Sequence, residues 1–140
     1  MSARPYTESL ERLKRAQLRP TRQRMALCRI LFDGGDRHVT AEQMLAEAHE
    51  AGVRVSLATI YNALHQFTQA GLLRQVIVDG AKTYFDTNIS GHHHFYNEET
   101  GALSDIPGDR VHVSGLPPAP YGAEIESIDV TVRLKRKNKN

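Results

Sequence analysis

The chain has 140 residues and a net charge of +2, with 40% hydrophobic and 24% charged residues. This length favours one ordinary domain or two small domains that share a partner. No run of about eighteen apolar residues occurs and the N-terminus has no apolar signal core, so we expect a cytoplasmic protein without a membrane partner. The single cysteine, Cys28, excludes an internal disulfide and any zinc site built from several cysteines of one chain.

The charges are unevenly distributed along the chain. Residues 1–74 contain eleven Lys or Arg against seven Asp or Glu, residues 75–132 contain two against nine, and residues 133–140 add five basic side chains. A basic first half indicates a polyanionic partner for that half. Random scatter is the alternative explanation, and the charge alone does not decide between the two.

Three helices are predicted in the first fifty residues. Each starts at a threonine whose hydroxyl can accept a hydrogen bond from the first turn, and the three caps are Thr7, Thr21 and Thr40. Pro20 ends the first helix, the second covers residues 22–32 and ends before Gly34, and the third runs to Glu50. The apolar side chains at helical spacing are Leu10, Leu13, Met25, Leu27, Ile30, Leu31, Met44, Leu45 and Ala48. Short links between three such helices indicate a helix-turn-helix core.

A fourth helix is predicted over residues 57–70, capped by Ser56. Its apolar positions share one arc of the wheel and are Leu57, Ile60, Tyr61, Leu64 and Phe67. Thr59, Asn62 and Gln66 point the other way, and no Lys, Arg, Asp or Glu occurs in these positions. A face of uncharged hydrogen-bonding groups is typical of a helix that meets base edges and phosphates in a major groove. A helix buried on both sides is the alternative.

Two strands, residues 72–78 and 81–86, follow this helix and are joined by a predicted two-residue turn at Asp79 and Gly80. A hairpin directly after a recognition helix is typical of a winged helix, whose wing lies along the phosphates of DNA. The candidate DNA-binding residues are Arg19, Arg22, Ser56, Thr59, Tyr61, Asn62, Gln66 and Lys82. Arg24 is a further candidate phosphate contact.

Three adjacent histidines, His92, His93 and His94, lie between the two halves of the chain. In a strand, alternation places His92 and His94 on one face and His93 on the other. Histidine is the commonest nitrogen ligand for iron, zinc and haem, so two imidazoles on one face indicate a ligand site. A solvated polar loop is the alternative.

The last fifty residues favour strands and loops. We expect a short strand at residues 102–106, a loop rich in proline and glycine at 107–122 with a short extended piece at 111–113, and a solvated basic tail. Between the loop and the basic tail, a half-buried strand is predicted from the alternating residues Ile128, Val130, Val132 and Leu134. So small a core favours pairing with a second copy. The predicted class is α+β, with a winged-helix domain at 1–87 and a β-rich dimerisation and sensing domain at 88–140.

Several of these segments resemble a known family in their order and spacing. They are Leu18-Arg-Pro-Thr21-Arg-Gln-Arg24, His38-Val-Thr40-Ala-Glu42, Val55-Ser-Leu-Ala-Thr59-Ile-Tyr61 with Gly71-Leu-Leu behind it, and the histidine run. Together, over roughly residues 10–106, they resemble the ferric uptake regulator (Fur) family of bacterial metal-dependent transcription factors. Within it, Ser90-Gly-His92-His-His94 and Gly80-Ala-Lys82-Thr-Tyr84-Phe-Asp86-Thr-Asn88 are most similar to the iron response regulators (Irr) of alphaproteobacteria.

Two departures from the family pattern limit what carries over. Where most members have Cys-x-x-Cys after the histidines, this chain has Asn97-Glu-Glu-Thr100, so the family's structural cysteine zinc site cannot form. A histidine of the last strand falls near Ile128, which cannot bind a metal. Irr-type members share the loss of the cysteines.

The resemblance implies a regulatory metal site made of His38, Asp86, His92, His94 and Asp105. Such imidazoles and carboxylates suit Fe²⁺ or Mn²⁺, with Zn²⁺ as a further candidate. An ion held by both domains would set the angle of two recognition helices on a double-stranded DNA operator, and we expect a homodimer.

Resemblance to Irr further implies a regulator of iron and haem homeostasis whose affinity for DNA falls when haem binds. The candidate haem ligands are His38, His92, His93 and His94. Cys28 is followed by Arg29 and lacks the Cys-Pro haem motif, so it is interpreted as a small core residue. His93, with His112, is a weaker candidate for a second site.

Three functions compete. The first is a DNA-binding regulator that responds to haem or iron, and its close alternative is a metal-ion or peroxide sensor that uses the same five ligands without haem. A small metal hydrolase is disfavoured, because five ligands leave little room for substrate and no separate general base or nucleophile is evident. We therefore expect no enzymatic activity.

Overall fold

The computed structural model describes residues 6–79 and 82–138, which fall into two compact units. Unit 1 is Met1–Ile89 and unit 2 is Ser90–Asn140. The domain boundary predicted from the sequence lies after residue 87, and the boundary between the two units lies after Ile89. Unit 1 contains helices and a small sheet, and unit 2 is built on a second small sheet. The fold is therefore of the α+β class.

The helices of unit 1 form where local capping signals predict them. Their bounds are α1 Thr7–Arg15, α2 Arg22–Phe32, α3 Ala41–Glu50 and α4 Leu57–Gln69. The predicted caps of α2, α3 and α4 are confirmed. The side-chain hydroxyls of Thr21, Thr40 and Ser56 each accept a hydrogen bond from the backbone N–H of the residue three positions later. The predicted cap of α1 is wrong, because Thr7 lies inside the helix and Tyr6, at the N-cap, makes no side-chain capping bond.

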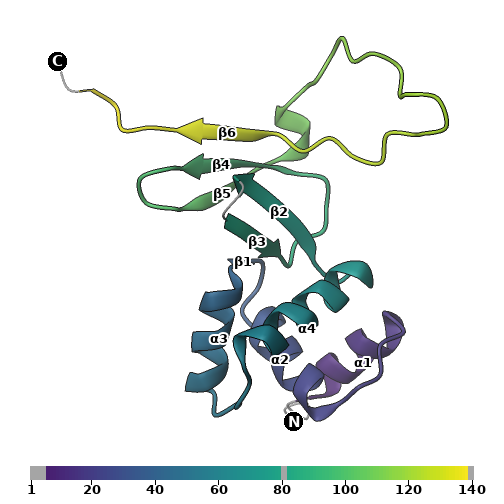
Figure 1. The fold of residues 1–140 in the computed structure, drawn as a ribbon, viewed down its shortest axis with the longest axis vertical. Helices are drawn as coiled ribbons and strands as arrows, with labels where there is room; N and C mark the ends of the chain where they lie inside the picture. Colours follow the sequence, from purple (N-terminus) through teal and green to yellow (C-terminus); the bar gives the residue numbers. More distant parts are fainter. Residues whose placement is uncertain (1–5, 80–81, 139–140) are drawn as a thin grey trace. The chain divides into compact units, whose positions relative to one another are not determined.

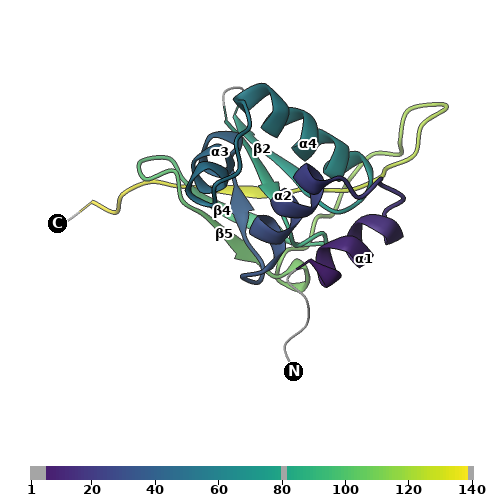
Figure 2. The same ribbon diagram turned by 90° about the horizontal axis from the view of Figure 1, so that it is seen from below.

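The core of unit 1 forms around α2, which lies in the middle of the four helices in both ribbon views (Figures 1 and 2). Leu31, Met44, Phe67 and Phe85 are fully buried there. Most of the predicted inward positions belong to this core, while Leu10 is only half-buried. Burial of these side chains fixes which face of α4 is turned outward.

A three-stranded antiparallel sheet completes unit 1. Its strands are β1 His38–Val39, β2 Arg74–Asp79 and β3 Lys82–Asp86, in the order β1-β3-β2. The predicted hairpin is confirmed by the pairing of β2 with β3. Asp79 belongs to β2 and pairs with Lys82, so its prediction as a turn residue is wrong, and Gly80 lies outside the described residues. β1 was not predicted, because two residues carry no readable periodicity.

Unit 2 is a sheet in the order β5-β4-β6. β4 His93–Asn97 pairs antiparallel with β5 Leu103–Ile106 and parallel with β6 Thr131–Leu134. A short 3₁₀ turn, Gly108–Arg110, follows β5. Val111, in the predicted extended piece at 111–113, has an extended backbone, and the segment forms no paired strand. Figure 1 shows the long loop that returns the chain to β6.

The prediction for the last strand is wrong in length and in burial. β6 begins only at Thr131, and Ile128, Val132 and Leu134 remain 37–40% exposed. β6 is an edge strand of its sheet, and alternation alone does not provide a layer to cover its apolar side. Within residues 6–79 and 82–138, every helix is too short or too polar to cross a membrane.

Candidate functional site

Three side chains of unit 2 converge at the start of β4. The ring centroids of His92 and His94 are 4.6 Å apart. The Nε2 atom of His92 lies 3.3 Å from Oδ1 of Asp105, and that of His94 lies 3.5 Å from the same oxygen. Asp105 reaches this position because it pairs directly with His94 in the β4–β5 register. The strand alternation predicted for the histidines is confirmed.

The spacing of these three atoms fits a bound metal ion. Nitrogen and oxygen ligands lie about 2.0–2.2 Å from a divalent transition metal or zinc, so neighbouring ligand atoms of a tetrahedral or octahedral site are about 3.0–3.4 Å apart. The distances of 3.3 and 3.5 Å match that separation. His92, His94 and Asp105 could therefore hold a metal ion together within one unit.

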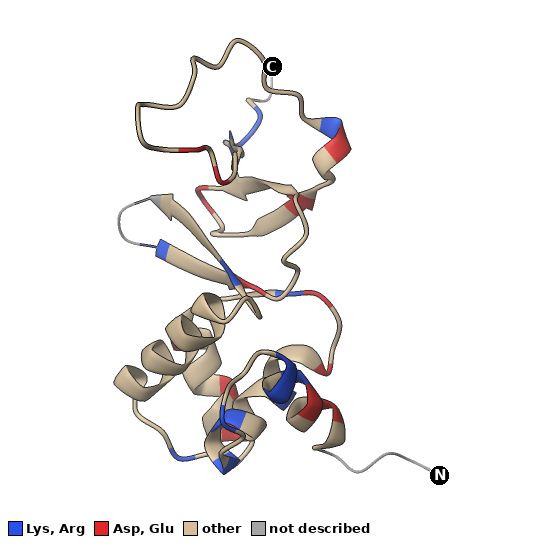
Figure 3. Cartoon of the chain, turned by 90° about the vertical axis from the view of Figure 1, so that its right-hand side faces the viewer, with Lys and Arg blue, Asp and Glu red and all other residues tan. Residues whose placement is uncertain are grey.

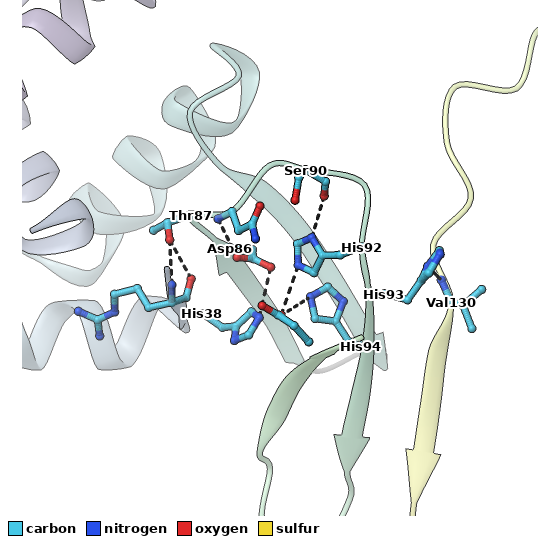
Figure 4. Close-up of polar contacts among 11 residues, drawn as sticks. His38, Asp86, Thr87, Ser90, His92, His93, His94 and Val130 are labelled. Carbon is cyan, nitrogen blue, oxygen red and sulfur yellow. Dashed lines mark hydrogen bonds and ion pairs between the residues drawn. The ribbon is translucent and has the colours of Figure 1, made fainter. Parts of the chain in front are cut away.

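A backbone carbonyl orients the ring of His92. Its Nδ1 atom lies 2.7 Å from the carbonyl oxygen of Ser90, which only accepts hydrogen bonds, so Nδ1 carries the proton (Figure 4). Nε2 then faces the carboxylate of Asp105 and is the ring atom that can coordinate a metal ion. A hydrogen bond from the other ring nitrogen to the protein holds a histidine ligand in the tautomer that binds a metal.

His93 points to the other side of β4, toward β6 (Figure 4). The backbone N–H of Val130 donates to its Nδ1 atom at 3.1 Å. His93 therefore lies outside the group of converging ligand atoms, and so does His112, an exposed residue of the long loop. The structure gives His93 an identifiable packing role, as the anchor of the segment that leads into β6.

Unit 1 carries a second, smaller pair of candidate ligands. His38 of β1 and Asp86 of β3 are direct partners in the sheet. Nε2 of His38 lies 3.2 Å from Oδ2 of Asp86, again the spacing of two ligands of one ion. The other oxygen, Oδ1, accepts the backbone N–H of Asn88 at 2.9 Å, which restrains the carboxylate.

A clamp next to His38 holds β1 against β3, and sequence reasoning missed it. The backbone N–H of Arg37 donates to Oγ1 of Thr87, and the N–H of Thr87 donates to the carbonyl of Arg37. The guanidinium of Arg37 makes a bidentate ion pair with Glu47 of α3, with N–O distances of 2.6 and 2.8 Å. This ties the strand of His38 to a helix next to α4. The ion pair of Arg37 with Glu47 becomes evident only from the positions of the two side chains in the folded protein.

The outward face of α4 carries the polar side chains predicted for DNA contact. Asn62 and Gln66 are exposed and Thr59 is half-buried, whereas Lys82 is exposed at the start of β3. In Figure 3, Lys and Arg colour other parts of unit 1, while α4 carries neither charge colour. A groove of about 420 Å³ runs between this face and the start of α2, and its lining residues are Arg19, Thr21, Gln23, Arg24, Thr59, Asn62, Ala63 and Gln66.

Several of the predicted contact residues have partners within the protein, Ser56 and Tyr61 among them. The hydroxyl of Ser56 caps α4 through the N–H of Thr59, so its availability to DNA is reduced. The hydroxyl of Tyr61 donates to Glu42 of α3 at 3.1 Å. This bond raises the pKa of Tyr61 above its ordinary value, because the carboxylate favours the protonated phenol. Glu42 had no role in the sequence interpretation, although it belongs to a family motif.

Cysteine chemistry plays no part in either candidate ligand group. Cys28 is buried in the core of unit 1, and burial raises the pKa of its thiol to about 11. At the position of the family's Cys-x-x-Cys, Oδ1 of Asn97 accepts the N–H groups of Glu99 and Thr100 in the turn between β4 and β5. The candidate ligands are therefore nitrogen and oxygen atoms.

The comparisons with known proteins identify the family of this chain. The pattern that defines the ferric uptake regulator family matches residues 15–133, and the chain belongs to this family. Its members are transcription regulators and not enzymes. The ferric uptake regulation protein of Pseudomonas aeruginosa is 38% identical over 95 residues, which cover 67% of this chain and 71% of that protein.

The chain is also similar to a peroxide-responsive repressor and to a solved structure of a ferric uptake regulator. The peroxide-responsive repressor PerR of Staphylococcus epidermidis is 32% identical over 99 residues, 71% of this chain and 65% of that protein. The structure of the P. aeruginosa ferric uptake regulator with manganese superposes with a TM-score of 0.71 at 26% identity, covering 93% of this chain and 98% of that one.

Proposed function

We propose that this protein is a DNA-binding transcription regulator of iron and haem homeostasis that works in the cytoplasm as a homodimer. Residues 1–87 act as a winged-helix domain, in which α4 reads the major groove and β2 and β3 form the wing. Residues 88–140 provide dimerisation and ligand sensing. Family membership and the uncharged, exposed face of α4 support this assignment.

The observation that carries the sensing role is the convergence of His92 and His94 on one oxygen of Asp105 at the spacing of metal ligands. We propose that these three residues act together with His38 and Asp86 on one divalent ion, Fe²⁺ or Mn²⁺, with Zn²⁺ as a further occupant. An ion held by donors of both units would join them. It would thereby set the separation of the two recognition helices of a dimer on its operator.

Haem is proposed as the physiological signal on the resemblance to Irr. Imidazoles serve as axial ligands of haem iron without any cysteine. His92 suits this role best, because the bond from its Nδ1–H to Ser90 makes Nε2 the ring atom that can coordinate iron. His38 and His94 are further candidates. For His93 the bond from Val130 to Nδ1 leaves the proton on Nε2, so ligation would require the other tautomer. Haem held by His92 or His94 would take these residues from the set that holds the divalent ion, and operator binding would weaken.

A second function is favoured by the similarity to the peroxide-responsive repressor. In this alternative the same five residues bind iron, manganese or zinc, and the protein responds to the ion or to peroxide without haem. The nitrogen and oxygen donors suit this chemistry equally well. The two functions differ in one observable property, which is whether haem binds to the histidines.

The test compares the parent protein with a variant that carries His92→Ala and His94→Ala together. Haemin is titrated while the Soret band is recorded, metal content is measured, and binding to operator DNA is followed by gel shift. The parent should develop a histidine-type Soret band and release DNA. The double variant should bind DNA without haem and should not respond to it.

His112→Ala is the matched control, because His112 is exposed and lies outside the cluster. It should respond like the parent. No Soret band in the parent, together with tight binding of Fe²⁺ or Zn²⁺, would refute the haem signal and leave the second function. Equal responses of the parent and the double variant would place the sensor elsewhere in the chain.

A further inference from the structure

Arg24 connects the start of α2 to the exposed face of α4. Its Nη1 group donates to the carbonyl oxygen of Arg19 at 2.9 Å, and its Nη2 group donates to Oε1 of Gln66 at 2.9 Å. Arg24 is half-buried, whereas Arg22, the first residue of α2, is exposed. Two of the guanidinium's donors are thus committed within the protein. This differs from the sequence interpretation, in which Arg24 contacts a phosphate.

The contact with Arg24 fixes which way the amide of Gln66 faces. A guanidinium has donors only, so the amide atom that meets it must be the oxygen. The amide nitrogen, with its two N–H donors, is then turned away from Arg24. Gln66 is exposed and lines the groove beside Asn62 and Thr59, so those donors face the side of α4 that is open to a partner.

This orientation changes which bases Gln66 can recognise. A free glutamine pairs with adenine through both atoms of its amide, because adenine presents a donor at N6 beside an acceptor at N7. A glutamine whose oxygen is turned toward Arg24 points its N–H₂ group the other way, so it is donor-only toward the groove. Guanine offers two acceptors and thymine offers O4, whereas cytosine offers a donor at N4. In adenine the N6 donor beside N7 would be left without an acceptor, so a donor-only glutamine favours guanine or thymine over adenine and cytosine.

We propose that Arg24 is a positioning residue for base recognition: it holds Gln66 as a donor-only reader and so selects guanine or thymine at one position of each operator half-site. The proposal rests on the proposed function, in which α4 enters the major groove. It assigns to Arg24 a role in specificity in place of a phosphate contact.

The experiment selects binding sites from a pool of randomised duplex DNA, using the haem-free full chain with Mn²⁺. Four proteins are compared: the parent, Arg24→Met, Gln66→Ala and Arg22→Met. Gln66→Ala should abolish the preference at one position. Arg24→Met should admit adenine there, with a loss of discrimination of about fivefold or more, the lower end of what one good base contact supplies. In the Gln66→Ala background, Arg24→Met should cause no additional change in specificity.

Arg22→Met is the matched control for a phosphate contact. It should weaken binding to all sequences alike and lower the slope of log affinity against log salt by about one, whereas Arg24→Met should leave that slope nearly unchanged. Gln66→Glu tests the same idea without altering Arg24. The carboxylate of the glutamate still accepts from Arg24 and presents only acceptor oxygens to the base. The preferred base should therefore change to cytosine, which presents a donor at N4.

Three results would overturn the inference. Arg24→Met that behaves like Arg22→Met would make Arg24 a phosphate contact, and additive effects of Arg24→Met and Gln66→Ala would show that the two residues act independently. A Gln66→Glu variant that keeps the parent's preference would show that Gln66 reads no base. In each case the parent still selects an operator and the proposed function stands. A parent that selects no sequence at all refutes the proposed function itself.

Discussion

Replacing His93 with leucine separates a structural role from a ligand role for the middle histidine of the run. In the folded protein, Nδ1 of His93 accepts the N–H of Val130, and the carbonyl of Val130 accepts the N–H of His94. Leucine has a similar volume and no acceptor. The variant therefore leaves the N–H of Val130 without its partner while the neighbouring bond to His94 remains.

The size of the effect follows from the surroundings of Val130. A buried donor that loses its partner costs about 1–3 kcal/mol. Val130 is only half-buried, so water replaces part of the lost bond and the lower end, about 1 kcal/mol, applies. For a chain of this length, that destabilisation lowers the melting temperature by about 3 °C. The same energy corresponds to amide exchange at Val130 that is about fivefold faster.

Thermal unfolding by circular dichroism and hydrogen exchange by NMR measure these two quantities. His112→Leu is the control, because an exposed loop residue should change the stability by less than about 0.5 kcal/mol. Metal and haemin affinities of His93→Leu should equal those of the parent. A reduced ligand stoichiometry in His93→Leu would refute the reasoning and make His93 a ligand. Unchanged exchange at Val130 would refute its role as an anchor.

Two further predictions follow from local geometry. A methyl group added at Gly108 meets the backbone carbonyl of Gly91 too closely to fit, whereas one added at Gly91 meets nothing within 4 Å. Gly108→Ala should therefore displace the segment before His92 and lower metal affinity by about tenfold or more, the size of the loss when a residue that orients a ligand is changed. Gly91→Ala should leave the affinity unchanged, and metal competition measures both variants. Thr21→Ala should lower the free energy of unfolding by about 1 kcal/mol, because Thr21 caps α2, whereas Thr7→Ala should have little effect, because no side chain caps α1; equal losses in denaturant unfolding would contradict the capping assignment.

Local signals explain why the helices of unit 1 were predictable. The bounds of α2 and α3 match the prediction and α4 ends one residue earlier, because caps such as Thr21 and Ser56 act within a single turn. β1 and the parallel pairing of β6 were not predictable in this way. They depend on bonds between residues far apart in the chain, such as His38 with Asp86, and such pairings have no short-range signature.

The same division applies to the candidate ligands. A chain with one buried cysteine leaves only histidine and carboxylate donors, and strand alternation separates His93 from its two neighbours. Which carboxylate would face those neighbours depended on the register of β4 against β5, which places Asp105 opposite His94.

The amino-acid sequence by itself determined the kinds of donor atoms, the alternation of the histidines and the uncharged face of α4, because these depend on residue type and on spacing within one element. Only the tertiary structure decided which groups meet: Asp105 with both histidines, Glu42 with Tyr61, and Arg24 with Gln66, 42 residues further along the chain. The physical reason is that helix and strand periods are local properties of the backbone, whereas these contacts are set by how whole elements pack.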